Sequence, residues 1–116
     1  MSKWIEITTT EEWSRWRSDP NKRPALIMKH STQCSVSADA YREFETFLAE
    51  SAPTDVDYLF VKVIESRAVS NQIAADLDVK HQSPQAILVR NGLPLWDQSH
   101  WHITQQSLKE AVDQHL

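Results

Sequence analysis

Residues 25–37 read ALIMKHSTQCSVS, an apolar run followed by a polar turn that leads to a cysteine. The four apolar residues 25–28 are typical of a strand that is covered on both faces. After the turn, apolar residues recur at steps of three and four between Val36 and Leu48, which predicts an amphipathic helix. Cys34 is therefore predicted to stand at the entrance of a helix that follows a buried strand.

The chain on either side of this stretch alternates predicted strands and helices. Before it, a short strand precedes a helix in which Thr9 and Glu12 have the spacing of a capping box and Trp13 and Trp16 share one face. The other predicted strands are 4–7, 58–64, 86–89 and 93–96, with a helix around 69–77. The order β-α-β-α-β-α-β-β-α predicts an α/β fold with a mainly parallel central sheet and helices on both faces.

The last two strands carry the clearest turn signal. Asn91-Gly92 separates two apolar runs and suits a type I′ hairpin turn, which requires positive φ at both residues. Gly92 is the only glycine in the chain. Pro94 in the returning strand predicts a sheet edge, because proline cannot donate to a ladder of hydrogen bonds. Thr104 is then predicted to cap the terminal helix.

Length and composition restrict the classes of function. A chain of 116 residues is expected to form a single domain, residues 1–116. The net charge of −4 argues against a nucleic-acid partner. No apolar run is long enough for a membrane span, and the first residues lack the apolar core of a signal peptide, so we expect a cytoplasmic protein with no membrane partner.

The single cysteine cannot close a disulfide within the chain. It is either buried, reactive toward another molecule, or paired with another chain. Polar neighbours and the predicted helix start favour a reactive thiol, because unpaired N–H groups and the helix dipole stabilise a thiolate there. Lys29 and His30 are expected to add positive potential, and Ser37 to donate a hydrogen bond to the sulfur.

The order of elements, one cysteine after the second strand, and Ser83-Pro84 before the hairpin together resemble thioredoxin. The resemblance implies a cis peptide bond at Ser83-Pro84 that faces Cys34. It also implies that the backbone of Ser83 pairs with an extended ligand, as in strand addition. Taken alone, the dipeptide favours an ordinary trans proline.

Four segments sharpen this resemblance: 29–37, 65–71, 79–85 and 96–100. From about residue 25 onward the chain resembles the monothiol bacilliredoxins, the YtxJ-like group of the bacillithiol system. The resemblance implies reduction of mixed disulfides between protein cysteines and bacillithiol, with Cys34 as nucleophile and Ser37 as the motif serine. We assign thiol binding to residues in and opposite this motif, namely His30, Thr32, Gln33, Ser35, His81, Ser83 and Pro84.

One departure from the family pattern concerns the residue after the cysteine, where Ser35 replaces the usual proline. Proline at a helix start carries no N–H and is shaped for the turn, so serine adds a donor near the sulfur and loosens the turn. Two alternatives stay open: an iron–sulfur carrier, in which Cys34 from two chains holds a cluster, and a redox interaction domain without turnover, which Ser35 favours.

We expect no tightly bound cofactor and no metal, since the histidines, His81 and His100 among them, lack metal-ligand spacing. His81 and His100 are instead expected to orient backbone near the site or to lie at the surface. The expected co-substrate is bacillithiol, the expected partners are S-bacillithiolated client proteins, and the expected state is a monomer.

Overall fold

The chain folds into a sheet with helices on both faces in the computed structural model, which describes residues 4–33 and 35–116. Its elements are β1 (Trp4–Glu6), α1 (Thr10–Ser18), β2 (Ala25–His30), α2 (Ser35–Glu50), β3 (Asp57–Lys62), α3 (Arg67–Leu77), β4 (Gln85–Arg90), β5 (Leu93–Ser99), the 3-10 turn η1 (His100–His102) and α4 (Gln105–His115). The predicted order of strands and helices is confirmed, and η1 is an addition to it. Over the described ranges, no helix is long and apolar enough to cross a membrane.

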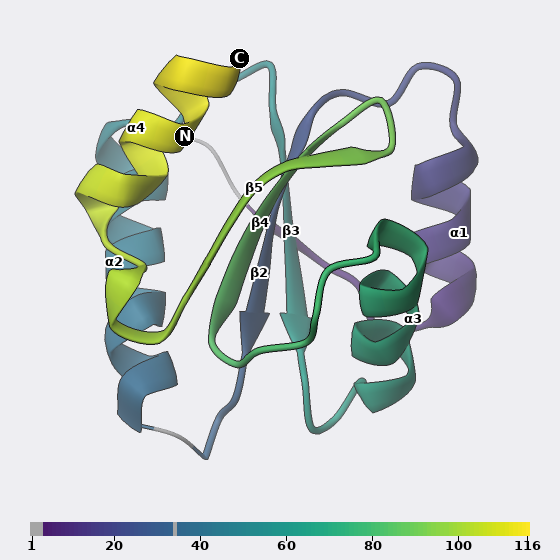
Figure 1. The fold of residues 1–116 in the computed structure, drawn as a ribbon, viewed down its shortest axis with the longest axis horizontal. Helices are drawn as coiled ribbons and strands as arrows, with labels where there is room; N and C mark the ends of the chain where they lie inside the picture. The colour runs from purple at the N-terminus through teal and green to yellow at the C-terminus, as the bar shows by residue number, and fades with distance from the viewer. Residues whose placement is uncertain (1–3, 34) are drawn as a thin grey trace.

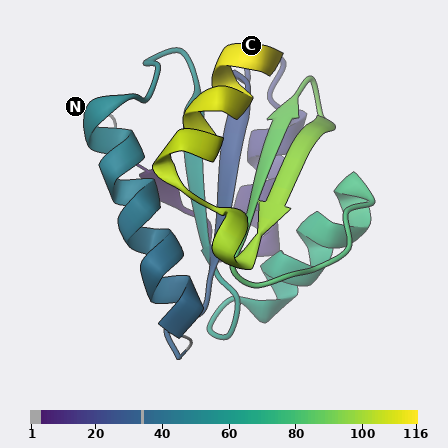
Figure 2. The same cartoon turned by 60° about the vertical axis from the view of Figure 1, so that its left-hand side comes forward.

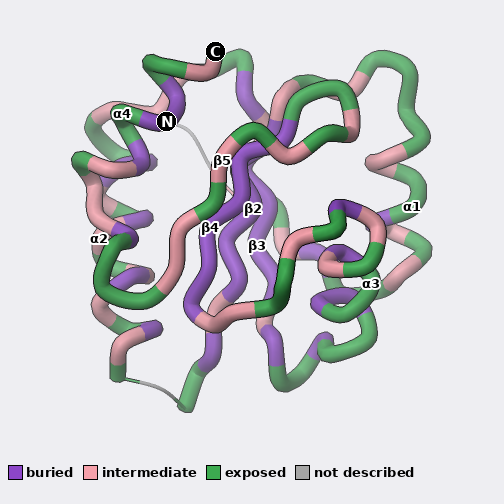
Figure 3. The backbone as a smooth tube through the Cα atoms, viewed as in Figure 1, coloured by how far each residue is buried: buried purple, intermediate pink, exposed green. Residues whose placement is uncertain are grey.

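The sheet is mixed, with the strand order β1-β3-β2-β4-β5 over the described residues. β1 and β2 run parallel to β3, β4 runs antiparallel to β2, and β5 returns antiparallel along β4. The predicted combination of a parallel centre and an antiparallel hairpin is therefore confirmed. The four apolar residues of β2 are buried, as predicted, and so is Lys29, which the sequence pattern places in the polar turn. The central strands are buried along most of their length (Figure 3).

The helices form two layers, with α2 and α4 on one face of the sheet and α1 and α3 on the other (Figure 1). Alternate residues of β2 enter two separate cores, because successive side chains of a strand point to opposite faces. Leu26 and Met28 pack with α2 and α4, whereas Ala25 and Ile27 pack with α1 and α3. We call these the α2 face and the α3 face.

The ends of the elements follow the sequence signals closely. Thr9 and Thr104 both cap their helices through complete capping boxes. Asn91 and Gly92 have φ values of 55° and 77°, as a type I′ turn requires, and β5 with its Pro94 lies at the sheet edge (Figure 2). β3 ends at Lys62, two residues before its predicted end, because the Lys62 carbonyl accepts from the Ser66 N–H (2.8 Å) and closes a turn.

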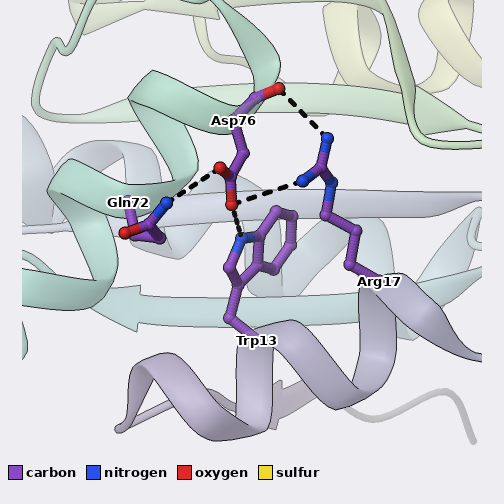
Figure 4. Close-up of polar contacts among 4 residues, drawn as sticks. All are labelled: Trp13, Arg17, Gln72 and Asp76. Atoms are coloured by element: carbon purple, nitrogen blue, oxygen red, sulfur yellow. Dashed lines mark hydrogen bonds and ion pairs between the residues drawn. The ribbon is translucent and has the colours of Figure 1, made fainter.

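Polar contacts join α1 to α3 around one carboxylate (Figure 4). The indole Nε1 of Trp13 donates to Asp76 Oδ2 at 2.8 Å, and Gln72 donates to Oδ1 at 2.8 Å. Arg17 donates to the Asp76 carbonyl (3.3 Å) and lies 3.6 Å from Oδ2. Because Trp13 is fully buried, its N–H needs a partner within the protein, and Asp76 supplies it.

Candidate functional site

The carboxyl end of β2 and the start of β4 meet at one end of the sheet. In the antiparallel register Lys29 pairs with Gln85, so one further step places Pro84 opposite His30. The Ser83-Pro84 bond is cis, as predicted, and the Pro84 carbonyl accepts from the backbone N–H of His100 at 3.0 Å. Ser83 and Pro84 therefore lie at the same end of the sheet as the turn that leads to the cysteine.

Ser37 ties this turn to the first turn of α2. Its buried Oγ accepts from the Ser31 N–H at 3.2 Å, and Ser31 Oγ accepts from the Gln33 N–H at 3.3 Å. The side chains of Thr32 and Gln33 are exposed. A hydrogen bond from Ser37 to a sulfur stays a prediction, but its hydroxyl already has a positioning role in the loop.

Cys34 lies outside the described residues, so its placement at the helix entrance and opposite Pro84 stays a prediction. The exposed Ser35, which follows it in the chain, is the first residue of α2. The first turn of α2 contains no acidic residue. The positive end of this helix dipole is consequently not compensated by a carboxylate from its own first turn, which favours an anion there.

His30 lies on the α2 face among aromatic rings. Its ring centroid is 5.2 Å from that of Tyr41 and 5.5 Å from that of Phe60. Burial lowers the pKa of His30, so the imidazole is neutral at pH 7. The expectation that His30 adds positive charge at the thiol is therefore wrong, because desolvation disfavours the imidazolium.

Two buried side-chain atoms at this end of the sheet have no hydrogen-bond partner among the described residues: His30 Nδ1 and Ser83 Oγ. Buried polar atoms are ordinarily satisfied, so atoms without a partner often mark a place where a ligand or water binds. Both belong to residues that the sequence assigned to thiol binding.

Lys29 points to the opposite face from His30. Its fully buried Nζ donates to the Ser70 carbonyl at 3.0 Å and lies 3.3 Å from Nδ1 of His81. Ser70 Oγ is 3.2 Å from the same nitrogen. Burial lowers the pKa of Lys29 to about 8. Burial and the charge of Lys29 also lower the pKa of His81.

The contact between Lys29 and His81 is absent from the sequence-based assignment. The strand period of two offers a partial signal, since Lys29 must point to the same face as the core residue Ile27. The partner could not be found this way, because it lies 52 residues away along the chain.

The structure brings most of the predicted site residues to one end of the sheet. His30, Thr32, Gln33, Ser35 and Ser37 come from β2, the turn and α2, and Ser83 and Pro84 come from the start of β4. His81 precedes Ser83 by two residues and is attached to the α3 face through Lys29 and Ser70. Within the described ranges no group of three or more His, Cys, Asp or Glu side chains could hold a metal ion.

The sequence and the arrangement of its strands and helices have counterparts among known proteins. The family model described as "Monothiol bacilliredoxin BrxC" matches residues 5–108. This chain belongs to the monothiol bacilliredoxin family. The match includes all four segments on which the resemblance was based, and the predicted family is confirmed.

Solved structures confirm the predicted thioredoxin-like fold. A candidate oxidoreductase with a thioredoxin fold is 32% identical, with a TM-score of 0.80 over 93% of this chain and 92% of that one. The thioredoxin of Malassezia sympodialis is 16% identical, with a TM-score of 0.78 over 99% and 92%. That of Fasciola hepatica is 16% identical, with a TM-score of 0.72 over 100% of both chains. Family and fold together support a thiol redox role.

Proposed function

We propose that this bacilliredoxin is a monothiol oxidoreductase that removes bacillithiol, or a similar low-molecular-weight thiol, from protein mixed disulfides through Cys34. The observation that carries the proposal is the family match over residues 5–108, which spans the whole candidate site. The chain has one cysteine, so Cys34 is the only thiol that it can use.

The first step is a thiol–disulfide exchange. The Cys34 thiolate attacks the bacillithiol sulfur of the mixed disulfide, and a Cys34–sulfur bond forms as the bond to the client sulfur breaks. The client leaves as a thiolate and takes a proton from water. The client cysteine is thereby reduced, and Cys34 is oxidised to a mixed disulfide with bacillithiol.

The second step requires a thiol from outside the chain. A second bacillithiol thiolate attacks the bacillithiol sulfur on Cys34, which releases the Cys34 thiolate and forms the symmetrical bacillithiol disulfide. Ser37 cannot take this role, because a hydroxyl forms no disulfide. The step is proposed to occur in the cytoplasm, where low-molecular-weight thiols are kept reduced.

Other residues at this end of the sheet are proposed to hold the ligand and lower the pKa of the thiol. The start of α2, without acidic residues in its first turn, favours the thiolate over the thiol. The Ser83 hydroxyl, buried and without a partner in the described residues, is proposed to hydrogen-bond the bound thiol. The exposed Thr32, Gln33 and Ser35 are proposed to contact it from the other side.

The test uses the full-length protein and a purified client that carries one bacillithiol mixed disulfide. Mass spectrometry is expected to show the client losing bacillithiol while the protein gains one adduct, and Cys34→Ala is expected to abolish both changes. The same client carrying glutathione measures the preference for the small thiol. An unmodified wild-type Cys34 would contradict the proposal, and a visible absorbance band in protein purified without oxygen would indicate the iron–sulfur carrier instead.

A further inference from the structure

Lys29 is a fully buried charged side chain that the exchange reaction does not itself require. Its contacts are the Ser70 carbonyl on α3 and Nδ1 of His81, in the loop before β4. A lysine ammonium can only donate hydrogen bonds, so a nitrogen that faces it must accept. Nδ1 of His81 therefore carries no proton in this arrangement.

The proton of the neutral His81 ring is consequently on Nε2. Lys29 Nζ lies 3.3 Å from Nδ1 and can only donate to it, and the Ser70 hydroxyl lies 3.2 Å from the same nitrogen. The other tautomer would place an N–H against the ammonium, which is unfavourable. The residue is exposed, and no partner for Nε2 exists among the residues that the structure describes. Nε2–H is thus an ordered donor available to a ligand.

The loop around His81 is held close to the candidate thiol site. Gln85, which pairs with Lys29 across the sheet, donates to the Lys80 carbonyl at 3.0 Å and accepts from the Gln82 N–H at 3.4 Å. Two residues of chain reach at most roughly 7 Å, so the His81 backbone lies within that distance of Ser83. A small thiol bound along Ser83 would therefore lie next to the loop that carries His81.

The charges that act on His81 are positive. Lys29 from β2 and Arg67 from the start of α3 both lower the pKa of His81, and neither is offset there by an acidic group. A neutral donor in the positive field of Lys29 and Arg67 favours an anionic acceptor over a cationic or neutral one. Among the groups of a small biological thiol, a carboxylate fits this description.

We propose that Lys29 is a positioning residue that holds the His81 ring with Nε2–H outward, and that this N–H binds a carboxylate of the incoming low-molecular-weight thiol. The inference rests on the proposed function and adds to it a determinant of substrate choice. The two adjacent residues of β2 would then have different roles: His30 lies on the α2 face, which carries the helix after the cysteine, and Lys29 acts through His81 from the α3 face.

The first test compares two symmetrical disulfides as probes, one formed from mercaptoacetate and one from 2-mercaptoethanol. Both react with Cys34 by exchange, giving one mixed disulfide and one released thiol, but only the first carries carboxylates. For each variant the rates of adduct formation are expressed as the ratio of carboxylate probe to neutral probe, so that changes in thiol reactivity cancel. His81→Leu is expected to lower this ratio roughly 10- to 100-fold, the effect of losing a charge-assisted hydrogen bond.

Three further variants distinguish a loss of His81 orientation from a non-specific disturbance of the protein. Lys29→Met is expected to lower the ratio less than His81→Leu does, because the ring stays but loses its preferred orientation. His81→Gln retains a donor and is expected to restore most of the ratio. His115→Ala is the matched control, since His115 lies on the last turn of α4, at the end of the molecule where the chain terminates (Figure 1).

The second test reads the His81 tautomer directly by ¹H–¹⁵N correlation of the imidazole ring. The wild type is expected to show the Nε2–H tautomer alone, and Lys29→Met to show both tautomers with a higher His81 pKa. A wild-type Nδ1–H tautomer would overturn the inference, and so would a probe ratio that His81→Leu leaves unchanged. Absence of a Cys34 adduct with either probe would overturn the proposed function, and the ligand role of His81 with it.

Discussion

The two faces of the sheet are held together by different kinds of contact. On the α3 face, indole and ammonium groups bond to oxygens: Trp13 to Asp76, Trp16 to Asp57 (2.9 Å) and Lys29 to Ser70. Trp13 and Trp16 also stack there, with centroids 5.6 Å apart, but most of the aromatic ring contacts lie on the α2 face. Trp4 stacks on Phe60 with centroids 4.7 Å apart, and Phe47 meets Tyr58 edge-on at 6.0 Å.

The difference is clearest at the end of β2, where two adjacent side chains point to opposite faces and enter different surroundings. Lys29 enters a polar cluster that restrains the loop before β4. His30 enters an aromatic cluster that leaves its Nδ1 without a partner in the described part of the chain. The α3 face thus anchors the loop before β4, while the α2 face carries the helix that follows the cysteine in the chain.

The largest effect on stability is expected from replacing the buried cation of the α3 face. Lys29→Met should raise the free energy of unfolding at pH 7 by about 1–3 kcal/mol, because a desolvated ammonium is replaced by an apolar chain of similar length. Urea denaturation measures the change, and Lys62→Met, on a partly exposed lysine of β3, is the matched control. A destabilised Lys29→Met protein would show that the contacts of Lys29 outweigh its desolvation.

The same substitution has a definite pH dependence. The pKa of Lys29 is about 8 in the folded protein and near 10.5 when unfolded, so the unfolded chain binds more protons between these values. The free energy of unfolding of the wild type therefore rises relative to that of Lys29→Met as the pH rises from 8 toward 10.5. The difference between the two proteins is the quantity to follow, because burial raises the pKa of Tyr41 to about 12 and adds an opposing alkaline trend to both.

A second substitution tests whether the carboxylate of Asp76 is needed on the α3 face. Asp76→Ala should lower the free energy of unfolding by about 1–3 kcal/mol, because the buried Trp13 N–H loses its acceptor. Asp76→Asn keeps an oxygen acceptor and is expected to cost less. Equal losses in the two variants would indicate that charge, and not the hydrogen bond to Trp13, is what matters.

The contribution of Asp76 to the stability of the wild type is lost at low pH. The hydrogen bond from Trp13, followed by those from Gln72 and the charge of Arg17, lowers the pKa of Asp76. The ionised Asp76 carboxylate contributes fully to the free energy of unfolding above the ordinary aspartate pKa. This contribution is lost as the pH falls through the lowered pKa of Asp76 in the folded protein. Acid titrations of unfolding should therefore be flatter in Asp76→Asn than in the wild type.

A smaller effect is expected on the α2 face, at the loop that leads to the cysteine. Ser37→Ala removes the acceptor of the Ser31 N–H and should cost about 1 kcal/mol of unfolding free energy. Faster amide hydrogen exchange at Ser31 would locate the loss. Ser35→Ala, on the exposed neighbour two residues earlier, is the control and should leave the Ser31 amide unchanged.

The smallest effect is expected at the position where this chain departs from its family. Ser35 is the first residue of α2, a position where proline is favoured, so Ser35→Pro should stabilise the protein by about 0.4–1 kcal/mol. Thermal unfolding measures the gain against Ser35→Ala. A loss of stability would show that the Ser35 N–H makes a contact that proline cannot replace.

Local patterns in the sequence were sufficient to predict most of the architecture. The apolar run of β2, the three- and four-residue spacing of α2, the Thr9 and Thr104 caps and the Asn91-Gly92 turn all depend on neighbours within a few residues. Each such signal acts through hydrogen bonds and side-chain periods that the backbone imposes locally. The cis bond at Pro84 was predictable only from the resemblance to thioredoxin, since the dipeptide alone favours trans.

By itself, the sequence determined the order of the elements, the family and the single thiol available for chemistry. Tertiary structure decided the partners of the buried polar groups: Lys29 with Ser70, 41 residues away, and Trp13 with Asp76, 63 residues away. It also lowered the pKa of His30, because burial beside the rings of Tyr41 and Phe60 disfavours the imidazolium. Such contacts depend on which helix covers which face of the sheet, and burial makes each polar partner a requirement of the fold.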